Sequence, residues 1–582
     1  MVTQTETRAQ VVPGEARRRT IGRLWFDAVA RNGSRTAYLV ERDGEWREVS
    51  WPEAAQAVDE LAHGLLALGI RKGDVFAILA RTTLEWALFD FALALLGAVT
   101  APVYASSSPK DAQYVLRHSE AIGALCEDEE QRAKLEGLAL EHVLTFADLD
   151  ELGVRGREHA RERPNAVHDV AASIGEDDLF TYIYTSGTTG PPKACMITHR
   201  NYFEMVAVAD EMEDLTREDD LMLLYLPLAH NFGRLMHLSG PHRGYAIAFL
   251  PDPLQVAAAL LEVRPTVLPS VPRVYEKVHT AVLAKFDEET GVKKRLIDWA
   301  LSVGYRVSRL EQHGERIPRR LALQRSLAAK LVYSKVMDRL GGRVRVGISG
   351  GAPLAREIAE FFHALGLLII EGYGLTEGTS AATVNRVDRF KFGTVGVALP
   401  RVELKLADDG ELLIRSPMNF AGYYKDEAAT REVLTDDGWL RTGDVAEIDD
   451  DGFVTITDRK KDIIVTAGGK NVAPQNLENE LKTHKEISQA LVIGDKRPYV
   501  AALVTLDSEA AGGMTDDQKQ ARVQEIVDDV NRDRSRFEQI KRFVILPRDF
   551  SAEEGEVTPT LKLKRRVVAE HFANEIERLY AP

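Results

Sequence analysis

The chain has 582 residues, of which 45% are hydrophobic and 28% are charged. A chain of this length exceeds what one hydrophobic core supports, so we expect two or more domains. Its 74 basic residues are outnumbered by 89 acidic ones, which gives a net charge of −15. This balance disfavours nucleic acid as a partner, because phosphate backbones are bound by basic surfaces.

The cysteines and the apolar stretches indicate a cytoplasmic protein. Cys126 and Cys195 lie in apolar surroundings without a framework spacing, which is typical of reduced, buried thiols. The first twenty residues are polar, so a secretory signal is not expected. The most apolar stretch, residues 91–103, falls short of the ~18 residues that span a bilayer. Peripheral attachment to the inner membrane face stays open, and the oligomeric state is unknown.

Helices and strands alternate through the first part of the chain. Ser50 and Glu53 form a capping box that predicts a helix over residues 50–68. Further along we expect strands at 75–80, 99–103, 121–126 and 143–146, with a helix at 84–96. This alternation predicts a largely parallel, doubly wound sheet. The charged segment 155–164 is expected to be a surface loop.

A glycine-rich segment follows the apolar strand predicted at 179–184. Residues 185–193 read TSGTTGPPK and contain Thr185, Ser186, Gly187, Thr188, Thr189, Gly190 and Lys193. Glycines allow close backbone approach, and N–H groups, hydroxyls and a lysine together can surround an anion. Composition alone would favour a flexible linker, but the preceding strand and the following Pro-Pro-Lys favour polyphosphate capture. The spacing does not match a P-loop.

Three later strands, predicted at 221–226, 343–349 and 367–371, each end in candidate site residues. The first leads to His230, which either faces a ligand crevice or is a hydrogen-bonded core histidine. The second leads to Gly350, Gly351, Ala352 and Pro353, and the third to Gly372, Tyr373, Gly374, Leu375, Thr376 and Glu377. The glycine-rich turns suit a flat ring on which Tyr373 could stack, and Glu377 is a candidate metal ligand.

Residues 305–345 reverse the charge of the chain, with eleven basic residues against Glu311, Glu315 and Asp338. Apolar residues are interleaved with them, namely Leu321, Leu323, Leu327, Leu331, Val332 and Tyr333. One interpretation is a solvated pair of helices with one buried stripe. The other is peripheral contact with an anionic membrane, where each basic residue adds about 1 kcal/mol.

The last third of the chain changes pattern twice. Short strands with Asp-Gly turns from 393 to 458 predict a small antiparallel barrel, in which Asp444 could bind ribose hydroxyls. A charged connector at 458–462 precedes what we expect to be a separate domain. Its predicted strands are 463–466, 489–493 and 500–506, and its predicted helices are 474–481, 516–530 and 563–579.

Seven ordered motifs between residues 185 and 565 resemble those of adenylate-forming enzymes, the superfamily of acyl-CoA synthetases, luciferases and peptide-synthetase adenylation domains. They are TSGTTGPPK, LPLAHNFGR, SGGAPL, GYGLTEG, GWLRTGD, DRKKD and PTLKLKR. LPLAHNFGR, VPRVYEK at 271–277 and GGKNVAPQNLE at 468–478 look most like long-chain fatty acid–CoA ligases.

The resemblance implies an α/β fold with a large N-terminal domain over residues 1–457. This domain would combine doubly wound α/β subdomains with a small β-barrel at about 393–457. A hinge at 458–461, with Lys461 as its pivot, would lead to a small mobile α+β C-terminal domain over 462–582.

The implied substrates are a long-chain fatty acid, ATP and coenzyme A, with Mg²⁺ as cofactor. In such a ligase the 185–193 loop would hold the β- and γ-phosphates, and Thr185 and Glu377 would hold Mg²⁺. Tyr373 and the Gly350–Pro353 turn would enclose adenine, Thr376 would contact the α-phosphate, and Asp444 with Arg459 nearby would bind the ribose.

The resemblance also assigns the groups that act on the reacting atoms. Lys562 would neutralise the carboxylate and the phosphate as they meet, and losing such a cation costs on the order of 100 to 1,000-fold. His230 would orient the carboxylate. After a hinge motion, the segment containing Gly468 and Gly469 would line the path of the thiol.

Two departures and two alternatives bear on this interpretation. Ala194 stands where many relatives carry glycine, and Arg234 stands where some fatty acid relatives carry an aromatic gate, so gating cannot be carried over. A fatty acyl-AMP ligase that loads a carrier protein would carry an insertion, for which there is no room between Phe453 and Asn471. An inactive lipid-binding member is disfavoured because the expected site residues are present, namely Thr185, Lys193, Glu377, Asp444 and Lys562.

Overall fold

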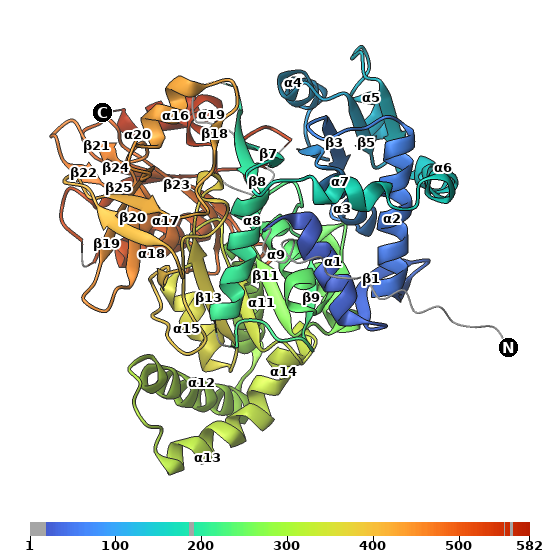
Figure 1. Ribbon diagram of the computed structural model, residues 1–582. Helices are drawn as coiled ribbons and strands as arrows, with labels where there is room; N and C mark the ends of the chain where they lie inside the picture. The colour runs from blue at the N-terminus through green and yellow to red at the C-terminus, as the bar shows by residue number, and fades with distance from the viewer. Residues whose placement is uncertain are drawn as a thin grey trace.

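The computed structural model describes residues 19–185, 191–212, 214–532, 534–551, 553–558 and 563–581. Two sheets and their helices form a large body, and a smaller unit at the C-terminal end packs beside it (Figure 1). Six candidate site residues lie outside the described residues: Ser186, Gly187, Thr188, Thr189, Gly190 and Lys562. Within the described part of the chain, no helix is long and apolar enough to cross a membrane.

The larger sheet contains nine strands among the described residues. In spatial order they are β15 (Val397–Ala398), β14 (Thr383–Val384), β13 (Leu368–Tyr373), β12 (Val346–Ser349), β11 (Val267–Ser270), β9 (Leu221–Leu224), β10 (Ala246–Phe249), β1 (Thr36–Arg42) and β2 (Glu45–Ser50). In this spatial order, every pairing from β13 across to β1 is parallel. The pairings of β15 with β14, β14 with β13, and β1 with β2 are antiparallel.

The second sheet contains the strands on either side of residues 186–190. Its order is β18 (Gly422–Tyr423), β8 (Lys193–Thr198), β7 (Leu179–Thr185), β4 (Val99–Tyr104), β3 (Val75–Ala80), β5 (Gly123–Cys126) and β6 (His142–Thr145). From β7 to β6 the pairings are parallel, whereas β7, β8 and β18 pair antiparallel. The prediction of a largely parallel, doubly wound fold is confirmed.

Helices cover both sheets of the body. They are α1 (Ile21–Asn32), α2 (Trp51–Ala67), α3 (Leu84–Leu96), α4 (Pro109–Ser119), α5 (Glu129–Ala133), α6 (Leu149–Glu162), α7 (Ala166–Ala172), α8 (His199–Ala207), α9 (Asn231–Arg243), α10 (Val256–Val263), α11 (Pro272–Glu288), α12 (Gly291–Gln312), α13 (Arg319–Ala328), α14 (Ser334–Met337), α15 (Arg356–Ala364) and α16 (Glu427–Val433). Short 3-10 helices are η2 (Phe146–Asp148), η3 (Val208–Glu211), η4 (Pro253–Gln255), η6 (Asp338–Leu340) and η7 (Thr376–Gly378), and η5 (Ala329–Tyr333) is a π-helix. Ser50 and Glu53 form the predicted capping box of α2.

The prediction of a surface loop at 155–164 is wrong, because most of this segment belongs to α6. A Cβ atom at Gly156 would lie 1.9 Å from Glu60 O, and one at Gly64 would lie 2.5 Å from Leu152 O. Glycines therefore let the backbones of α6 and α2 approach closely. The apolar periodicity of 155–164 did not reveal the helix, since much of its contact is made by glycine.

The strands expected to form a barrel instead make an open antiparallel sheet. Its order is β16 (Glu403–Leu406), β17 (Glu411–Arg415), β19 (Leu440–Ile448) and β20 (Val454–Arg459). Within the described residues, β16 and β20 do not pair with each other. Strand β20 continues through Asp458 and Arg459, so only the second half of the predicted hinge lies in a turn.

The C-terminal unit contains strands β21 (Ile464–Val465), β22 (Asn471–Val472), β23 (Ile487–Ile493), β24 (Val500–Leu506) and β25 (Ile540–Ile545). Its helices are α17 (Pro474–Leu481), α18 (Asp516–Asn531), α19 (Arg565–His571) and α20 (Ala573–Tyr580). The helix predicted at 563–579 is interrupted at Phe572, and β25 was not predicted. In the described chain, the buried apolar residues of this unit cluster apart from the core of the body.

Candidate active site

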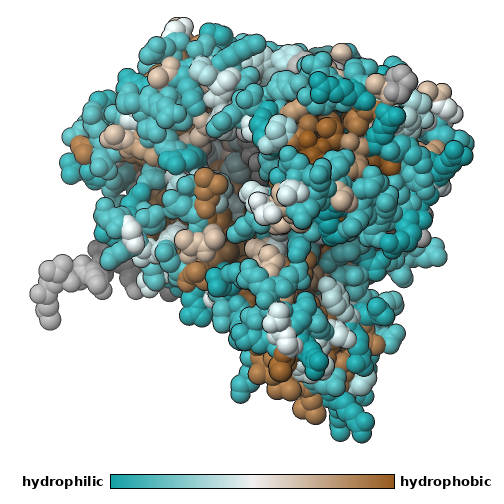
Figure 2. All heavy atoms as spheres, turned by 180° about the vertical axis from the view of Figure 1, so that it is seen from behind, coloured by the Kyte–Doolittle hydropathy of each residue, from teal (hydrophilic) through white to brown (hydrophobic). Residues whose placement is uncertain are grey.

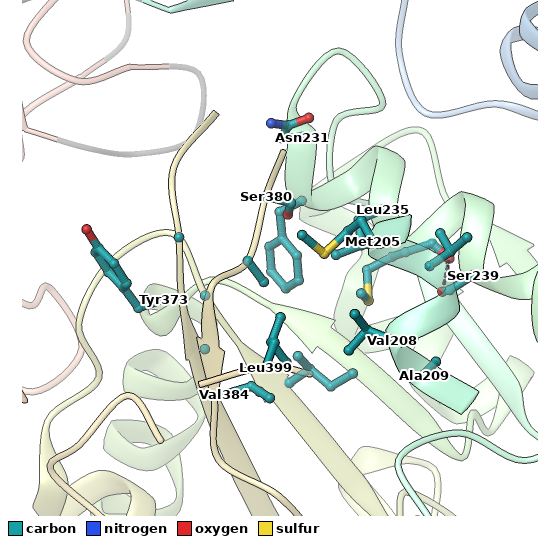
Figure 3. A pocket seen from close by; sticks show the side chains of 18 of the residues that line it. Met205, Val208, Ala209, Asn231, Leu235, Ser239, Tyr373, Ser380, Val384 and Leu399 are labelled. Carbon is teal, nitrogen blue, oxygen red and sulfur yellow. Dashed lines mark hydrogen bonds between the residues drawn. The ribbon is translucent and has the colours of Figure 1, made fainter. Parts of the chain in front are cut away.

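A pocket lies at the carboxyl ends of β12 and β13. Tyr373 lies at one end of it, and Val208, Ala209 and Ser239 lie at the other (Figure 3). In open α/β sheets, ligands bind outside the carboxyl ends of the strands. This pocket is therefore the candidate active site.

The end of the pocket away from Tyr373 is apolar. It is formed by α8, η3 and α9, which contribute Met205, Val206, Val208, Ala209, Met212, Leu235 and Met236. Methionine side chains are flexible and adapt to an irregular apolar ligand. Ser239 and Thr216 also line the pocket, and the Ser239 hydroxyl donates to Met236 O at 2.8 Å and contacts the Tyr245 hydroxyl. This end suits a hydrocarbon group.

The other end is built largely from backbone. Gly350, Gly351, Gly372 and Gly374 line it, whereas Ala352 and Pro353 do not contribute to the wall. Only glycine fits at Gly374, because a Cβ atom there would lie 1.8 Å from Ser380 O. Because glycines carry no side chain, the backbone of the two turns forms much of this wall.

Tyr373, Asp444 and Arg459 come together beside the glycine turns. The Tyr373 hydroxyl donates to Asp444 Oδ2 at 2.6 Å, and Arg459 Nε lies 3.1 Å from Asp444 Oδ1. Asp444 and Arg459 are Cα partners on β19 and β20. Burial, followed by the Asp444 charge, raises the pKa of Tyr373 well above its ordinary value, so the tyrosine stays a hydrogen-bond donor. The predicted proximity of these residues is found in the structure.

His230 and Thr376 both line the pocket. His230 caps α9, with its Nδ1 accepting from Phe232 N at 3.2 Å. The neighbouring Asn231 donates to Thr376 O at 3.3 Å and accepts from the Tyr202 hydroxyl. Asn231 was not among the predicted site residues, although it adjoins His230 in the sequence. It joins the histidine-bearing helix to the Thr376 turn.

Thr185, Lys193 and Glu377 lie around the buried Cys195. Thr185 and Lys193 are cross-strand partners on β7 and β8. Burial raises the pKa of the Cys195 thiol, the nearby Glu377 charge raises it further, and a Thr185 hydrogen bond lowers it. Glu377 Oε1 accepts from the Tyr423 hydroxyl at 2.6 Å, and Lys193 Nζ lies 3.4 Å from Asp426 Oδ2. These contacts bring the two predicted magnesium ligands into one region.

The residues there fit a hydrated magnesium ion better than a caged metal. Among the described residues, no group of three or more histidine, cysteine, aspartate or glutamate side chains could hold a metal ion. Magnesium needs few protein ligands, because it keeps several waters and is completed by substrate phosphates. A hydroxyl and a carboxylate, those of Thr185 and Glu377, satisfy that requirement.

Glu371 supports the pocket from behind, and the sequence did not single it out as a site residue. It is buried on β13, and its Oε1 accepts from Leu354 N at 3.0 Å, which ties down the end of the Gly350–Pro353 turn. Burial raises the pKa of Glu371 to about 8, so the carboxyl is largely protonated at neutral pH. The property that marks Glu371 as a supporting residue is its burial, which the sequence alone does not reveal.

Three candidate residues lie away from the pocket. Gly468 and Gly469 form the exposed turn between β21 and β22, with a φ of 71° at Gly469. Lys461 lies in the exposed turn after β20. All three belong to the connector or the C-terminal unit, where the prediction requires a domain motion.

Arg234 does not line the pocket. Its side chain leaves α9 on the other side, pairs with Asp90, and donates to Thr181 Oγ1 at 2.6 Å. The guanidinium also lies 4.4 Å from the centre of the Phe180 ring. Arg234 therefore joins α9 to the second sheet, and its role in this chain is structural.

The pocket, the two sheets and the separate C-terminal unit together define an adenylate-forming fold. Residues 25–424 match the AMP-binding enzyme family, and residues 461–582 match the AMP-binding enzyme C-terminal domain. The chain belongs to the AMP-binding enzyme family, and the resemblance drawn from the seven motifs is confirmed.

Relatives and solved structures agree with this assignment. The chain is 40% identical over 573 residues to a protein named long-chain-fatty-acid–CoA ligase FadD15 from Mycobacterium bovis, covering 92% of this chain and 93% of that protein. It is 28% identical to the human long-chain-fatty-acid–CoA ligase ACSBG2, covering 98% and 93%. The adenylation domain of a carboxylate reductase from Mycobacterium chelonae superposes with a TM-score of 0.77 at 23% identity, covering 97% and 91%, which shows the shared fold.

Proposed function

We propose that this protein is a long-chain fatty acid–CoA ligase. The observation that carries the proposal is a single pocket with a backbone-lined polar end at Tyr373 and an apolar end at Ser239 (Figure 3). One molecule with a nucleotide at one end and a hydrocarbon chain at the other fits such a pocket. The 40% identity to a ligase of that name, over nearly the whole of both chains, supports the same activity.

In the first half-reaction, a carboxylate oxygen of the fatty acid attacks the α-phosphorus of ATP. The bond between the α-phosphorus and the bridging oxygen breaks, giving acyl-AMP and pyrophosphate. His230 and Thr376 line the pocket and would lie where the carboxylate meets the α-phosphate. Tyr373 and Asp444 at the polar end suit the adenosine, with the Asp444 carboxylate accepting from the ribose hydroxyls.

In the second half-reaction, the coenzyme A thiol attacks the acyl carbonyl, and AMP leaves with the bonding electron pair. Lys562 would act in the first step and the Gly468–Gly469 turn in the second, each presented by the C-terminal unit. Lys461 would be the pivot between the two arrangements. The separate apolar cores of the body and this unit support such a motion.

Magnesium would be held by Thr185 and Glu377 together with the nucleotide. When bound, it would offset the negative charge of the β- and γ-phosphates. Lys193 and the loop 185–190 would share that task through their N–H groups, hydroxyls and ammonium.

A fatty acyl-AMP ligase that loads a carrier protein is the alternative within the family. The turn between β20 and β21 spans residues 460–463, which leaves no inserted segment at this place in the described chain. Coenzyme A is therefore the preferred acceptor. Peripheral contact of residues 305–345 with an anionic membrane is a separate proposal that ligation does not require.

A pyrophosphate-release assay with palmitate and ATP, with and without coenzyme A, tests the proposal. We expect turnover that depends on the fatty acid and on Mg²⁺, with palmitoyl-CoA formed when coenzyme A is present. Formation of acyl-AMP that coenzyme A does not consume would identify the carrier-loading alternative. Absence of pyrophosphate release with acids from C6 to C20 would contradict the ligase assignment.

A further inference from the structure

Helix α13 carries an exposed apolar stripe on the protrusion that α12 and α13 form (Figure 1). The exposed fractions of Leu323, Leu327 and Leu331 are 73%, 51% and 37%. A spacing of four residues places these side chains on one side of the helix and its continuation into η5. In Figure 2, apolar atoms gather near the lower end of the molecule, where this protrusion lies.

The opposite side of the same helix holds the protrusion together. Leu321, Ala328 and Val332 are buried there, and the Tyr333 hydroxyl donates to Ala300 O at 2.5 Å. Helix α12 packs in turn on α15, where a Cβ atom at Gly304 would lie 2.2 Å from Ala364 O. The exposed leucines are therefore not needed for this packing.

Basic residues flank the leucines. Arg319, Arg320 and Lys330 are exposed and, at about 100° per residue, fall on the same half of the helix as Leu323 and Leu327. Within the described residues, these three cations take part in no ion pair, in a protein with a net charge of −15. An uncompensated positive patch in an acidic protein fits an anionic partner.

We propose that the α13 face, formed by Arg319, Arg320, Leu323, Leu327, Lys330 and Leu331, docks on a membrane that contains anionic phospholipid. Leucines on one side of a helix can enter the boundary between headgroups and acyl chains, while long basic side chains reach the lipid phosphates. This docking goes beyond ligation, which takes place in the pocket.

The basic segment 305–345 ends beside the wall of the pocket. Arg345 follows the protrusion in the chain and donates to the backbone oxygens of Asp214 and Leu215, at 2.8 and 3.0 Å. Leu215 lines the pocket on its apolar side.

Co-sedimentation of the full-length protein with lipid vesicles tests the proposal. We expect binding to vesicles of phosphatidylcholine with about one-third phosphatidylglycerol, weaker binding as salt rises, and little binding to phosphatidylcholine alone. The variant Arg319→Glu/Arg320→Glu/Lys330→Glu should lose at least ~100-fold in affinity, since each basic residue near such a surface contributes about fivefold. The variant Leu323→Ser/Leu327→Ser/Leu331→Ser should also lose binding.

Two control variants separate the α13 face from general effects. Lys110→Glu/Arg161→Glu/Arg163→Glu makes the same change in net charge at exposed positions elsewhere. Leu254→Ser removes another leucine, which is 91% exposed. Both controls should bind vesicles like the unmodified protein, and all variants should keep the basal rate with a short, soluble fatty acid.

Three results would overturn the proposal. One is equal binding of the unmodified protein to neutral and anionic vesicles, and another is loss of binding in the charge control as large as in the α13 variants. The third is self-association of the unmodified protein that the leucine substitutions abolish while vesicle binding persists. That result would make the α13 face an interface between copies of the chain.

Discussion

The two sheets of the body are joined to each other differently from the way the C-terminal unit is joined to the body. Inside the body, the main apolar core runs through both sheets, with buried members from Ile21 to Val454, and a second cluster is formed by residues of the second sheet and its helices. From Ile464 onward, the described buried apolar residues form their own clusters. A continuous core fixes the two sheets relative to each other, whereas separate cores allow one unit to turn against another.

The ion pairs follow the same division. Between the sheets of the body, the Arg234 and Asp90 side chains are 0% and 1% exposed. Between the body and the C-terminal unit, Arg273 donates to Ser488 O at 2.6 Å, and Lys482 Nζ lies 3.4 Å from Glu276 Oε1. Breaking a buried pair leaves an uncompensated charge, while partly exposed contacts can exchange with water. The first junction is held by a buried pair, and we expect the second, which is partly exposed, to be reversible.

The largest effect is expected where the two regions must act together. The variant Lys562→Ala should slow pyrophosphate release on the order of 100 to 1,000-fold, because a cation from the C-terminal unit would be lost at the meeting of two anions. The matched control is Lys564→Ala, two residues further along, which should keep nearly full activity. Equal rates in the two variants would separate the C-terminal unit from adenylation.

The buried junction can be compared with an exposed ion pair in the same body. The variant Arg234→Met should lower the free energy of unfolding by about 3–5 kcal/mol, since Asp90 would remain buried and unpaired. Arg415→Met, which breaks a pair with the exposed Glu403, should lower it much less, because water screens an exposed pair. Chemical denaturation measures both values, and similar losses would contradict the distinction.

The connector can be stiffened without touching the pocket. Lys461→Pro fixes one backbone φ angle in the turn after β20. We expect thioester formation to slow by more than pyrophosphate release, because only the second half-reaction follows the turn of the C-terminal unit. Rapid-quench measurement of both half-reactions provides the ratio. An equal reduction of both would remove Lys461 as the pivot.

The smallest effect is expected at the reversible junction. Arg273→Ala removes the hydrogen bonds to Ser488, and trypsin should cleave the connector at Lys460 or Lys461 up to ~fivefold faster, as a contact worth up to about 1 kcal/mol would allow. Arg431→Ala is the control, because it breaks an exposed pair with Glu427 inside the body. Its cleavage rate should match that of the unmodified protein.

Regular elements with strong apolar patterns were predictable from the sequence. Strand β3 and helix α3 have the predicted bounds, 75–80 and 84–96. Helix α6 was missed because glycine contacts leave no apolar period, and β25 was missed because Lys541 and Arg542 interrupt its apolar residues. The local sequence pattern predicts a helix or strand only where the buried contacts of that segment are made by its own apolar side chains.

The candidate site was predictable to the extent that its residues lie in contiguous motifs. Tyr373, Asp444 and Arg459 come together as expected. Asn231 and Glu371 were not identified, because their roles come from contacts with Thr376 and Leu354 on other turns. Arg234 lies within a motif but outside the pocket, because its place in the motif did not reveal which way its side chain points.

Helix α9 presents different residues to two neighbours. His230, Leu235, Met236 and Ser239 face the cavity, and Arg234 faces the second sheet. The residues that meet the hydrocarbon tail are therefore distinct from the residue that holds the helix in place. Substrate preference can diverge by substitutions on the inner surface of α9 alone, while the scaffold that positions the histidine is inherited intact.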